Sequence, residues 1–541
     1  MRYDNGGELL VAHLKSLGID TVFGIVSVHN LPLVEAVDRH LRFVPVRHEA
    51  TAVNAADGYG RARGSIGCAL TSTGTGAGNA AGSLIEALSS GTAVLHVTGQ
   101  VESRYLGSGR GFIHETKDQL GMLDAVSAYA DTVTSARDAG RVLREASAAA
   151  LATPGGPASV EWPIDLQYAA QEDAGEAAQV REAPSPDAAE LAAAQGLLGT
   201  ARRPLIWAGG GACHARPEVA ALLEATGAGL LSSNSGRGSV PEDHPLVIGN
   251  FATTPAVRAL LADADVLVTI GTHFRSNETA DYNLKLPDAH IQIDADAAAL
   301  GRVHPARHAL HGEAAAVLPA LTRAAVRADA DWSARVTAVR DEVRAALHDD
   351  IGPQAALCDA LATALPRGAV VARDVTIPSS SWGNRLLPIH DPRANVFPRG
   401  GGIGQGLGMG IGAALARPDE PTVVIAGDGG LAVHFGELLT VAQERPRLTV
   451  IVFNDGGYGV LRNMQDKYGE RRSGVDLFTP DFGSLAAACA LPYARVAAPE
   501  EAAPVLEAAL ASDGPTLVEV DLAALGPMKN PFTPPVKIPT A

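Results

Sequence analysis

The chain has 541 residues, of which 46% are hydrophobic and 19% charged, and its formal net charge is −17. A chain of this length exceeds what one hydrophobic core can organise, so we expect about two to four domains. The negative charge, without a long basic run, argues against nucleic acid or an anionic membrane surface as a partner.

The four cysteines, Cys68, Cys213, Cys358 and Cys489, are far apart and form no CxxC pair. This spacing predicts buried free thiols of a reducing compartment rather than disulfides or a zinc site. The first residues lack the apolar core of a signal peptide, and no apolar run is long enough to span a bilayer. We therefore expect a cytoplasmic protein.

The first block, residues 1–168, alternates short apolar runs with helical patterns. Helices are expected at Gly7–Leu17 and Ala50–Arg63, and strands at Thr21–Ile25, Phe43–Val46 and Ala93–Gly99. Strands that alternate with helices in this way are typical of a parallel α/β domain.

Two further blocks follow a polar, proline-containing stretch at 169–186, which reads as a linker. The second block spans 187–325, a charged helix near 326–350 connects it onward, and the third block spans 352–541. Strands expected in the second block are Pro204–Ala208, Val266–Ile270 and His290–Asp294. The fold class is thus α/β, with three Rossmann-like or flavodoxin-like parallel-sheet domains.

The most informative stretch runs from 422 to 459 and reads as strand, turn, helix, strand, turn. The strand Thr422–Ile425 leads to Gly-Asp-Gly-Gly at 427–430, and the strand Val450–Phe453 leads to Asn-Asp-Gly-Gly-Tyr at 454–458. Ligands bind at the carboxyl ends of parallel strands, and oxygen ligands there suit Mg²⁺ carrying a diphosphate. The alternative is an ordinary pair of turns that binds nothing.

This pattern resembles the metal–diphosphate motif of thiamine diphosphate (ThDP) enzymes. The resemblance implies that the side chains of Asp428 and Asp455 and the backbone carbonyl of Gly457 hold Mg²⁺. The family usually has Asn at the second of these positions, so Asp455 adds a negative charge beside a diphosphate. Cofactor contacts are implied for Gly427, Asp428, Gly429, Gly430, Asp455 and Tyr458.

A second resemblance surrounds Glu49, in the stretch RHEATAVNAADGYGRARG. ThDP enzymes have a glutamate in this context that hydrogen-bonds the aminopyrimidine ring. An apolar pocket raises the pKa of a glutamate, so that it can share a proton with a ring nitrogen. The alternative for an isolated Glu at a strand end is a solvated or salt-bridged side chain. The resemblance also implies that Thr73, in the glycine-rich turn at 72–79, contacts the cofactor.

The third resemblance is the glycine segment Arg399–Gly404. In ThDP enzymes of the decarboxylase group, such a segment precedes the metal motif and carries one bulky apolar residue. The resemblance implies that the carbonyl of Gly401 accepts from the 4′-amino group and that Ile403 enforces the bent cofactor. The alternative is a glycine-rich helix start. Residues 376–381 lie near the expected diphosphate.

Together these motifs identify the chain as similar to the superfamily of acetolactate synthase, benzoylformate decarboxylase and benzaldehyde lyase, over its whole length. In this superfamily the site lies between the first block of one subunit and the third of another. The resemblance therefore implies a homodimer or homotetramer acting on a small 2-oxo acid or aldehyde.

Two histidines are candidate acid–base groups on the substrate side. His29 follows the first strand, where its presence resembles benzaldehyde lyase and implies proton transfer at a hydroxyl or aldehyde oxygen. His114 stands where relatives often have a Gln that reaches the substrate. The alternative for each is a loop histidine that caps a helix or faces solvent.

The middle block has a turn, Gly209–Gly211, that could cradle a nucleotide pyrophosphate. Its segment Gly271–Asn277 departs from the letters of FAD-binding acetolactate synthases. We therefore expect this block to be a structural spacer, with FAD unlikely.

The resulting hypothesis is an Mg²⁺- and ThDP-dependent enzyme that decarboxylates a 2-oxo acid, ligates the acyl carbanion to a second carbonyl, or does both. One alternative is benzaldehyde lyase-like cleavage or formation of 2-hydroxyketones. A non-enzyme alternative is a catalytically silent nucleotide-binding homologue. A nicotinamide dehydrogenase would need a GxGxxG helix start, and Gly74–Gly78 lacks that spacing. The substrate's side chain and the acceptor stay open.

Overall fold

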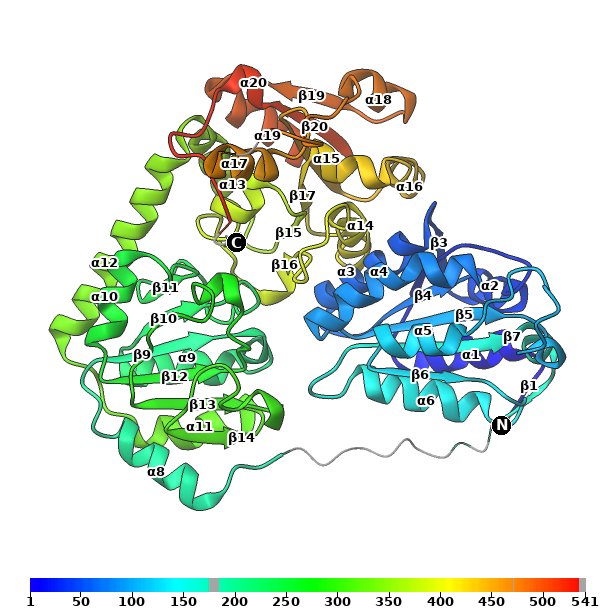
Figure 1. The fold of residues 1–541 in the computed structure, drawn as a ribbon, viewed down its shortest axis with the longest axis horizontal. Helices are drawn as coiled ribbons and strands as arrows, with labels where there is room; N and C mark the ends of the chain where they lie inside the picture. The colour runs from blue at the N-terminus through cyan, green and yellow to red at the C-terminus, as the bar shows by residue number, and fades with distance from the viewer. Residues whose placement is uncertain (174, 176–183, 470, 535–541) are drawn as a thin grey trace.

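The computed structural model describes residues 1–173, 175, 184–469 and 471–534. It contains three six-stranded sheets, in each of which all neighbouring strands are parallel. The three sheets form separate lobes, with helices packed beside them (Figure 1). The predicted α/β class with three parallel-sheet domains is confirmed.

The N-terminal sheet has the strand order β3-β2-β4-β5-β7-β6. Its strands are β2 (Thr21–Gly24), β3 (Arg42–Pro45), β4 (Gly67–Thr71), β5 (Val94–Gln100), β6 (Tyr129–Thr132) and β7 (Pro157–Pro163). Its helices are α1 (Gly6–Ser16), α2 (Leu31–His40), α3 (Glu49–Arg63), α4 (Thr75–Ser90), α5 (Gln119–Val126), α6 (Ala139–Ala150) and α7 (Ile164–Tyr168). The central strands β4, β5 and β7 are buried throughout, as near-continuous apolar strands of parallel sheets are.

The middle sheet has the order β11-β10-β9-β12-β13-β14. Its strands are β9 (Pro204–Ala208), β10 (Gly229–Ser232), β11 (Val247–Gly249), β12 (Val266–Ile270), β13 (His290–Asp294) and β14 (His308–His311). Its helices are α8 (Ala188–Leu198), α9 (Arg216–Thr226), α10 (Pro255–Asp263) and α11 (Ala314–Ala324), and α12 (Ala330–Asp350) leads to the third sheet.

The C-terminal sheet has the order β16-β15-β17-β18-β20-β19. Its strands are β15 (Val370–Arg373), β16 (Asn395–Val396), β17 (Thr422–Gly427), β18 (Leu448–Asn454), β19 (Tyr493–Val496) and β20 (Thr516–Asp521). Its helices are α13 (Ala355–Ala364), α14 (Gly406–Ala416), α15 (Asp428–Leu431), α16 (Glu437–Glu444), α17 (Gly459–Tyr468), α18 (Phe482–Ala488), α19 (Ala502–Leu510) and α20 (Leu522–Leu525).

Two sequence-based expectations need correction. The predicted linker contains a strand, β8 (Gln171–Glu172), which pairs antiparallel with β1 (Arg2–Tyr3); residues 174 and 176–183 lie outside the described part. The helical pattern after Gly430 is not one helix, because α15 ends at Leu431 and a 3₁₀ turn over Ala432–His434 separates it from α16. Periodicity alone cannot locate such a break.

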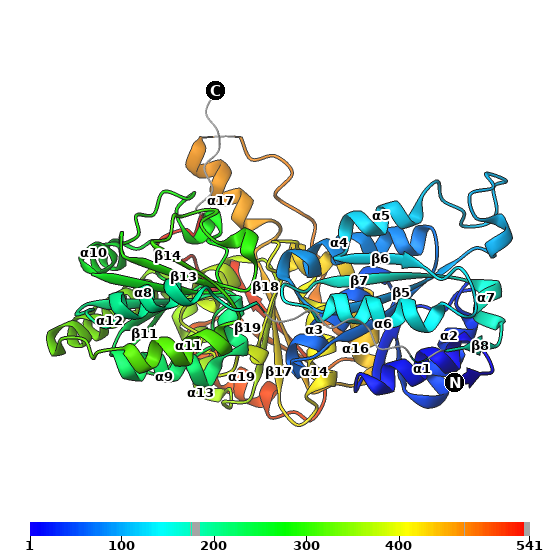
Figure 2. The ribbon, with the colours of Figure 1, turned by 90° about the horizontal axis from the view of Figure 1, so that it is seen from below.

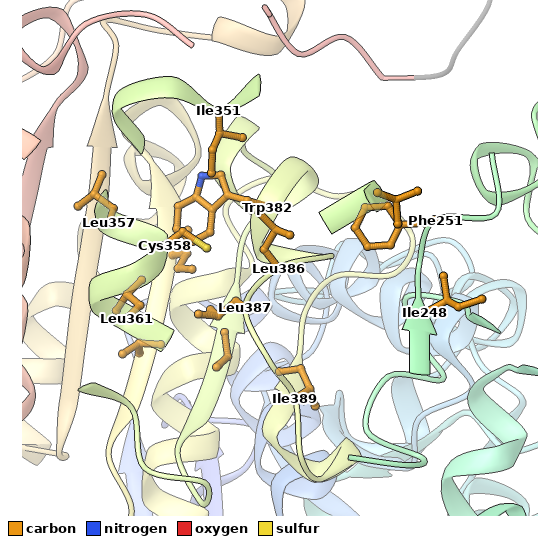
Figure 3. Close-up of a cluster of buried hydrophobic side chains, with 14 of the residues drawn as sticks. Ile248, Phe251, Ile351, Leu357, Cys358, Leu361, Trp382, Leu386, Leu387 and Ile389 are labelled. Carbon is orange, nitrogen blue, oxygen red and sulfur yellow. The ribbon is translucent and has the colours of Figure 1, made fainter. Parts of the chain in front are cut away.

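The middle and C-terminal sheets share a continuous hydrophobic core (Figure 3). Ile248 and Phe251 come from the middle domain, and Leu361, Trp382 and Leu387 from the C-terminal one. The buried Trp382 indole N–H donates to Gln354 Oε1 at 2.9 Å, so its polar atom is satisfied inside the core.

The N-terminal and C-terminal domains meet where α3 packs against α14, and both views place these helices at the centre of the molecule (Figures 1 and 2). A Cβ on Gly412 would lie 1.8 Å from the Ala55 carbonyl oxygen, and one on Gly58 would lie 2.0 Å from that of Met409. The two backbones therefore touch, and only glycine permits this approach.

Two buried histidines each bond a threonine hydroxyl on the neighbouring strand. His96 on β5 shares a hydrogen bond of 2.8 Å with the Thr71 hydroxyl on β4, and His290 on β13 one of 2.8 Å with the Thr269 hydroxyl on β12. Burial lowers the pKa of each histidine to about 4. Both rings are therefore neutral near pH 7.

The four cysteines are free thiols, and three are buried while Cys213 is partly exposed. None of the helices in the described residues is both long and apolar enough to cross a membrane.

We predict that Gly412→Ala lowers the free energy of unfolding by about 3 kcal/mol or more, at the upper end of overpacking costs, because the new methyl meets a backbone carbonyl. The control is Gly82→Ala in α4, where a Cβ meets nothing within 4 Å. That change should stabilise the helix by about 0.5–1 kcal/mol. Parallel chemical denaturation of the two variants measures both; equal midpoints would contradict the close α3–α14 contact.

We also predict that the stabilisation contributed by His96 and His290 is lost as the pH is lowered from about 6.5 toward 4. The unfolded histidines have ordinary pKa values near 6.5 and bind protons in this window, whereas native His96 and His290 do not. The unfolded state then holds more protons, so acid favours it. A His96→Gln/His290→Gln variant should show a flatter dependence of its denaturation midpoint on pH, and an unchanged slope would refute the assignment.

Candidate functional site

Two carboxylates meet at the carboxyl ends of β17 and β18. These strands are parallel neighbours, with Gly427 opposite Phe453. Asp428 starts α15 immediately after β17, and Asp455 follows β18 directly. Asp428 Oδ2 and Asp455 Oδ1 are buried and have no hydrogen-bond partner. The strand-end placement predicted for both residues is thus found.

The electrostatics of this pair favour a cation. Burial raises the pKa of Asp455 to about 6, and the neighbouring Asp428 carboxylate contributes to the same shift. Burial also raises the pKa of Asp428, against which the backbone N–H groups of Gly429, Asp455 and Gly457 act. Two close carboxylates with free oxygens repel each other, and a hard divalent cation relieves that repulsion. The donor set fits Mg²⁺.

Glycines shape the turns around the pair. A Cβ on Gly459 would lie 1.9 Å from Asp455 Oδ2, so the backbone of α17 starts directly on this carboxylate. A Cβ on Gly429 would lie 2.8 Å from the Tyr458 ring and 3.0 Å from the Gly457 carbonyl oxygen. This carbonyl therefore lies beside the Gly-Asp-Gly turn. No group of three or more His, Cys, Asp or Glu suited to a metal occurs in the described ranges, so backbone and external oxygens would have to complete the coordination.

The positive charge of Arg462 offsets the extra negative charge of Asp455. Its guanidinium donates to the carbonyl oxygens of Asp455 and Gly456 at 3.2 and 3.3 Å, and lies 3.7 Å from Asp455 Oδ2. It also bonds Asp476 at 2.8 Å. This arginine on α17 was not identified from the sequence, and its place one turn after the Asn-Asp-Gly-Gly turn is the signal that could have revealed it.

Asp374, which follows β15, is a second residue that sequence reasoning missed. Its carboxylate accepts the N–H groups of Gly404 at 2.9 Å and Gly406 at 3.4 Å, and burial raises its pKa to about 6. It thereby fixes the end of the glycine segment that contains Gly401 and Ile403. Gly401 has φ +89°, and the Ile403 side chain is 40% exposed.

Glu49 is the first residue of α3, one position earlier than expected for this helix. Its Oε2 accepts from Asn79 Nδ2 at 3.0 Å, and a Cβ on Gly76 would lie 3.0 Å from its Oε1. Asn79, in the predicted glycine-rich turn, had not been singled out.

His29 and His114 form a pair in the N-terminal domain. Their ring centroids lie 5.2 Å apart, and the Nδ1 atom of each is buried without a partner. Phe112 packs edge-on against His29 at 6.3 Å. Burial, and secondarily His114, lowers the pKa of His29. The structure thus brings together two residues that are 85 positions apart in the sequence.

Thr73 and the middle-domain glycines have intramolecular partners. The Thr73 hydroxyl is buried and donates to Gln119 Oε1 at 2.9 Å. A Cβ on Gly209 would lie 2.1 Å from the Gly271 carbonyl oxygen, so this turn packs tightly on the neighbouring loop. Close backbone packing explains the glycine at 209 without a bound nucleotide.

Family comparisons agree with this architecture. The thiamine pyrophosphate enzyme N-terminal TPP binding domain matches residues 4–122, the central domain 191–321 and the C-terminal TPP binding domain 378–520. A probable 2-ketoarginine decarboxylase of Pseudomonas aeruginosa is 32% identical over 95% of this chain and 93% of its own length. The chain belongs to the thiamine pyrophosphate enzyme family.

Other thiamine pyrophosphate enzymes match over similar lengths. Acetolactate synthase isozyme 2 large subunit of Escherichia coli is 29% identical over 96% of each chain. A probable acetolactate synthase large subunit of Methanocaldococcus jannaschii is 27% identical over 97% of this chain and 93% of its own. The recognised superfamily of synthases and decarboxylases is confirmed.

We predict that Arg462→Met weakens Mg²⁺-dependent binding of ThDP and that Asp455→Asn in the same chain restores it. Arg462 offsets the negative charge of Asp455, and asparagine carries no such charge. Loss of Arg462 should therefore weaken ThDP binding less in a chain that already carries Asp455→Asn. Calorimetric titration of the wild type, both single variants and the double variant gives the coupling energy. Additive effects of the two changes would show that Arg462 does not compensate Asp455.

Proposed function

We propose that the protein binds ThDP with Mg²⁺ and decarboxylates 2-oxo acids. The observation that carries this proposal is the buried pair Asp428 and Asp455, whose unpartnered oxygens lie at adjacent strand ends in a chain of this family. These carboxylates and the Gly457 carbonyl would hold Mg²⁺. Residues proposed to line the diphosphate are Gly427, Gly429, Gly430 and Tyr458.

Glu49 is the proposed cofactor-activating residue. Asn79 holds its Oε2, which leaves Oε1 to hold a proton at the pyrimidine ring. The Gly401 carbonyl and the Ile403 side chain, on a segment fixed by Asp374, would position the same cofactor. When bound, ThDP supplies the electron sink for loss of CO₂.

A second copy of the chain is proposed to complete the site. Ile403 is 40% exposed, and Val433, on which Gly404 packs, is 48% exposed. On the N-terminal domain, Val28 and Ile113 flank the histidine pair and are each 62% exposed. Apolar side chains gathered around functional groups mark an interaction surface. We infer a homodimer or homotetramer with its sites between subunits.

His29 and His114 are the proposed proton donors and acceptors on the substrate side. Two imidazoles with unpartnered Nδ1 atoms can each donate or accept, depending on the tautomer. Such a pair can protonate the product carbon after CO₂ leaves, or exchange a proton with an aldehyde or hydroxyl oxygen. The first use gives a decarboxylase, and the second permits carboligation or 2-hydroxyketone cleavage.

The names of the relatives guide the choice of substrates. One is named a decarboxylase of 2-ketoarginine and others acetolactate synthases. Decarboxylation is common to the proposed reactions with 2-oxo acids, so it is the primary proposal. Ligation to a second carbonyl is retained because the histidine pair can serve an acceptor oxygen as well.

We predict that CO₂ release requires Glu49. Assays with ThDP and Mg²⁺ would use pyruvate, benzoylformate, branched 2-oxo acids and 2-ketoarginine, with products identified by mass. Glu49→Gln cannot share the proton and should lower kcat at least about a hundredfold, whereas Glu507→Gln, at an exposed position of α19, should not.

The products separate the alternatives. An aldehyde identifies a decarboxylase, and a 2-hydroxyketone identifies a ligase. Cleavage of a 2-hydroxyketone without turnover of any 2-oxo acid would support the lyase alternative. Full activity of Glu49→Gln would overturn the assigned role of this residue.

A further inference from the structure

We propose that Gln119 is a positioning residue that sets the separation of His29 and His114. This inference rests on the proposed function, in which the two histidines exchange protons with the substrate. Gln119 is the first residue of α5 and is only 3% exposed, and its side-chain hydrogen bonds go to Thr73, Gly74 and Gly99 rather than to either ring. It acts through two glycines on which the histidines rest.

The first glycine is Gly74, which supports His114. A Cβ on Gly74 would lie 2.5 Å from the His114 carbonyl oxygen and 3.1 Å from its Cβ. Gly74 has φ +64° and donates its N–H to Gln119 Oε1 at 2.6 Å. The His114 backbone is itself left-handed, with φ +67°. The glycine and the histidine are therefore in direct backbone contact at a constrained turn.

The second glycine is Gly99, which supports His29. A Cβ on Gly99 would lie 2.3 Å from the His29 carbonyl oxygen and 2.9 Å from its Cβ. The Gly99 carbonyl accepts from Gln119 Nε2 at 3.3 Å. The Gln119 amide thus accepts from Gly74, which contacts His114, and donates to Gly99, which contacts His29.

Buried neighbours fix the orientation of this amide. The Thr73 hydroxyl donates to Gln119 Oε1 at 2.9 Å, so Oε1 receives two donors and must be the oxygen. Beyond Thr73, Gln100 Nε2 donates to Glu161 Oε1 at 3.0 Å, and the Thr132 hydroxyl donates to Glu161 Oε2 at 2.6 Å. A connected, buried network of this kind resists displacement.

Removing the amide should move the histidines apart. Gln119→Met keeps the length of the side chain and loses both glycine contacts. Since burial and His114 together lower the pKa of His29, separation should raise the pKa of His29 toward its ordinary value. His114 is the titratable neighbour that acts on His29, and the other titratable groups near Gln119 are Glu161 and Asp118.

The test is an NMR titration of the His29 ring in the full-length protein without substrate, so that it holds even if the proposed reaction is wrong. The matched control is Gln171→Met, a buried glutamine of the same domain whose amide donates to the carbonyls of Leu166 and Ala169 at 2.7 Å each. Gln119→Met should shift the His29 titration upward, and Gln171→Met should leave it in place.

A second variant keeps the test decisive if Gln119→Met does not fold. Gln119→Asn keeps a neutral amide that is one methylene shorter, so it loses the glycine contacts without placing a charge near the rings and should shift the His29 titration in the same direction. If the enzyme turns over 2-oxo acids, Gln119→Met should also lower kcat by about tenfold to a hundredfold with unchanged ThDP affinity. A His29 titration identical to wild type in both folded variants would overturn the proposal.

Discussion

The backbone contact between α3 and α14 is the constraint on which the rest of the structure depends. The two helices approach so closely that Ala55 and Met409 carbonyl oxygens occupy the space of a side chain. Because interiors are close-packed, such a contact allows little sliding or tilting. It fixes Glu49, at the start of α3, relative to the glycine segment that leads into α14. Further hydrogen bonds between the two domains, such as that from the Arg47 N–H to Glu437 at 3.0 Å, add to an arrangement that the α3–α14 contact already fixes.

The sheets and the acid pair could be predicted from the sequence because their signals are local. Apolar runs such as Val266–Ile270 coincide with strands, and Asp428 and Asp455 follow such runs directly. Two of the residues that were missed, Asn79 and Asp374, have partners distant in the chain. Asn79 meets Glu49 across 30 positions, and Gly404 meets Asp374 across 30. No periodicity reports a hydrogen bond between separate loops, so these residues became visible only in three dimensions.

The two halves of the candidate site use opposite electrostatics. On the C-terminal domain, two carboxylates with raised pKa values lie at strand ends, with Arg462 beside one of them. Without a bound cation the two carboxylates repel each other, which costs free energy. A cation bound between them replaces this repulsion with attraction. On the N-terminal domain, burial lowers the pKa of His29, which favours the neutral form of its ring. Charge is concentrated where a diphosphate and a metal are proposed, and is excluded where proton transfer is proposed.

This difference in electrostatics also explains why the histidine pair depends on a buried hydrogen-bond network for its position. A neutral imidazole has no strong ionic partner to hold it, and neither Nδ1 atom of the pair is bonded within the described chain. Its position must then come from the backbone beneath it, through close contacts that only glycine allows. Gly74 and Gly99 provide those contacts, yet glycine is also the residue that restrains the chain least. The buried Gln119 amide, with three hydrogen bonds, restores the restraint without placing a charge near the rings. The carboxylate pair needs no such device, because each aspartate directly follows a central strand of the sheet.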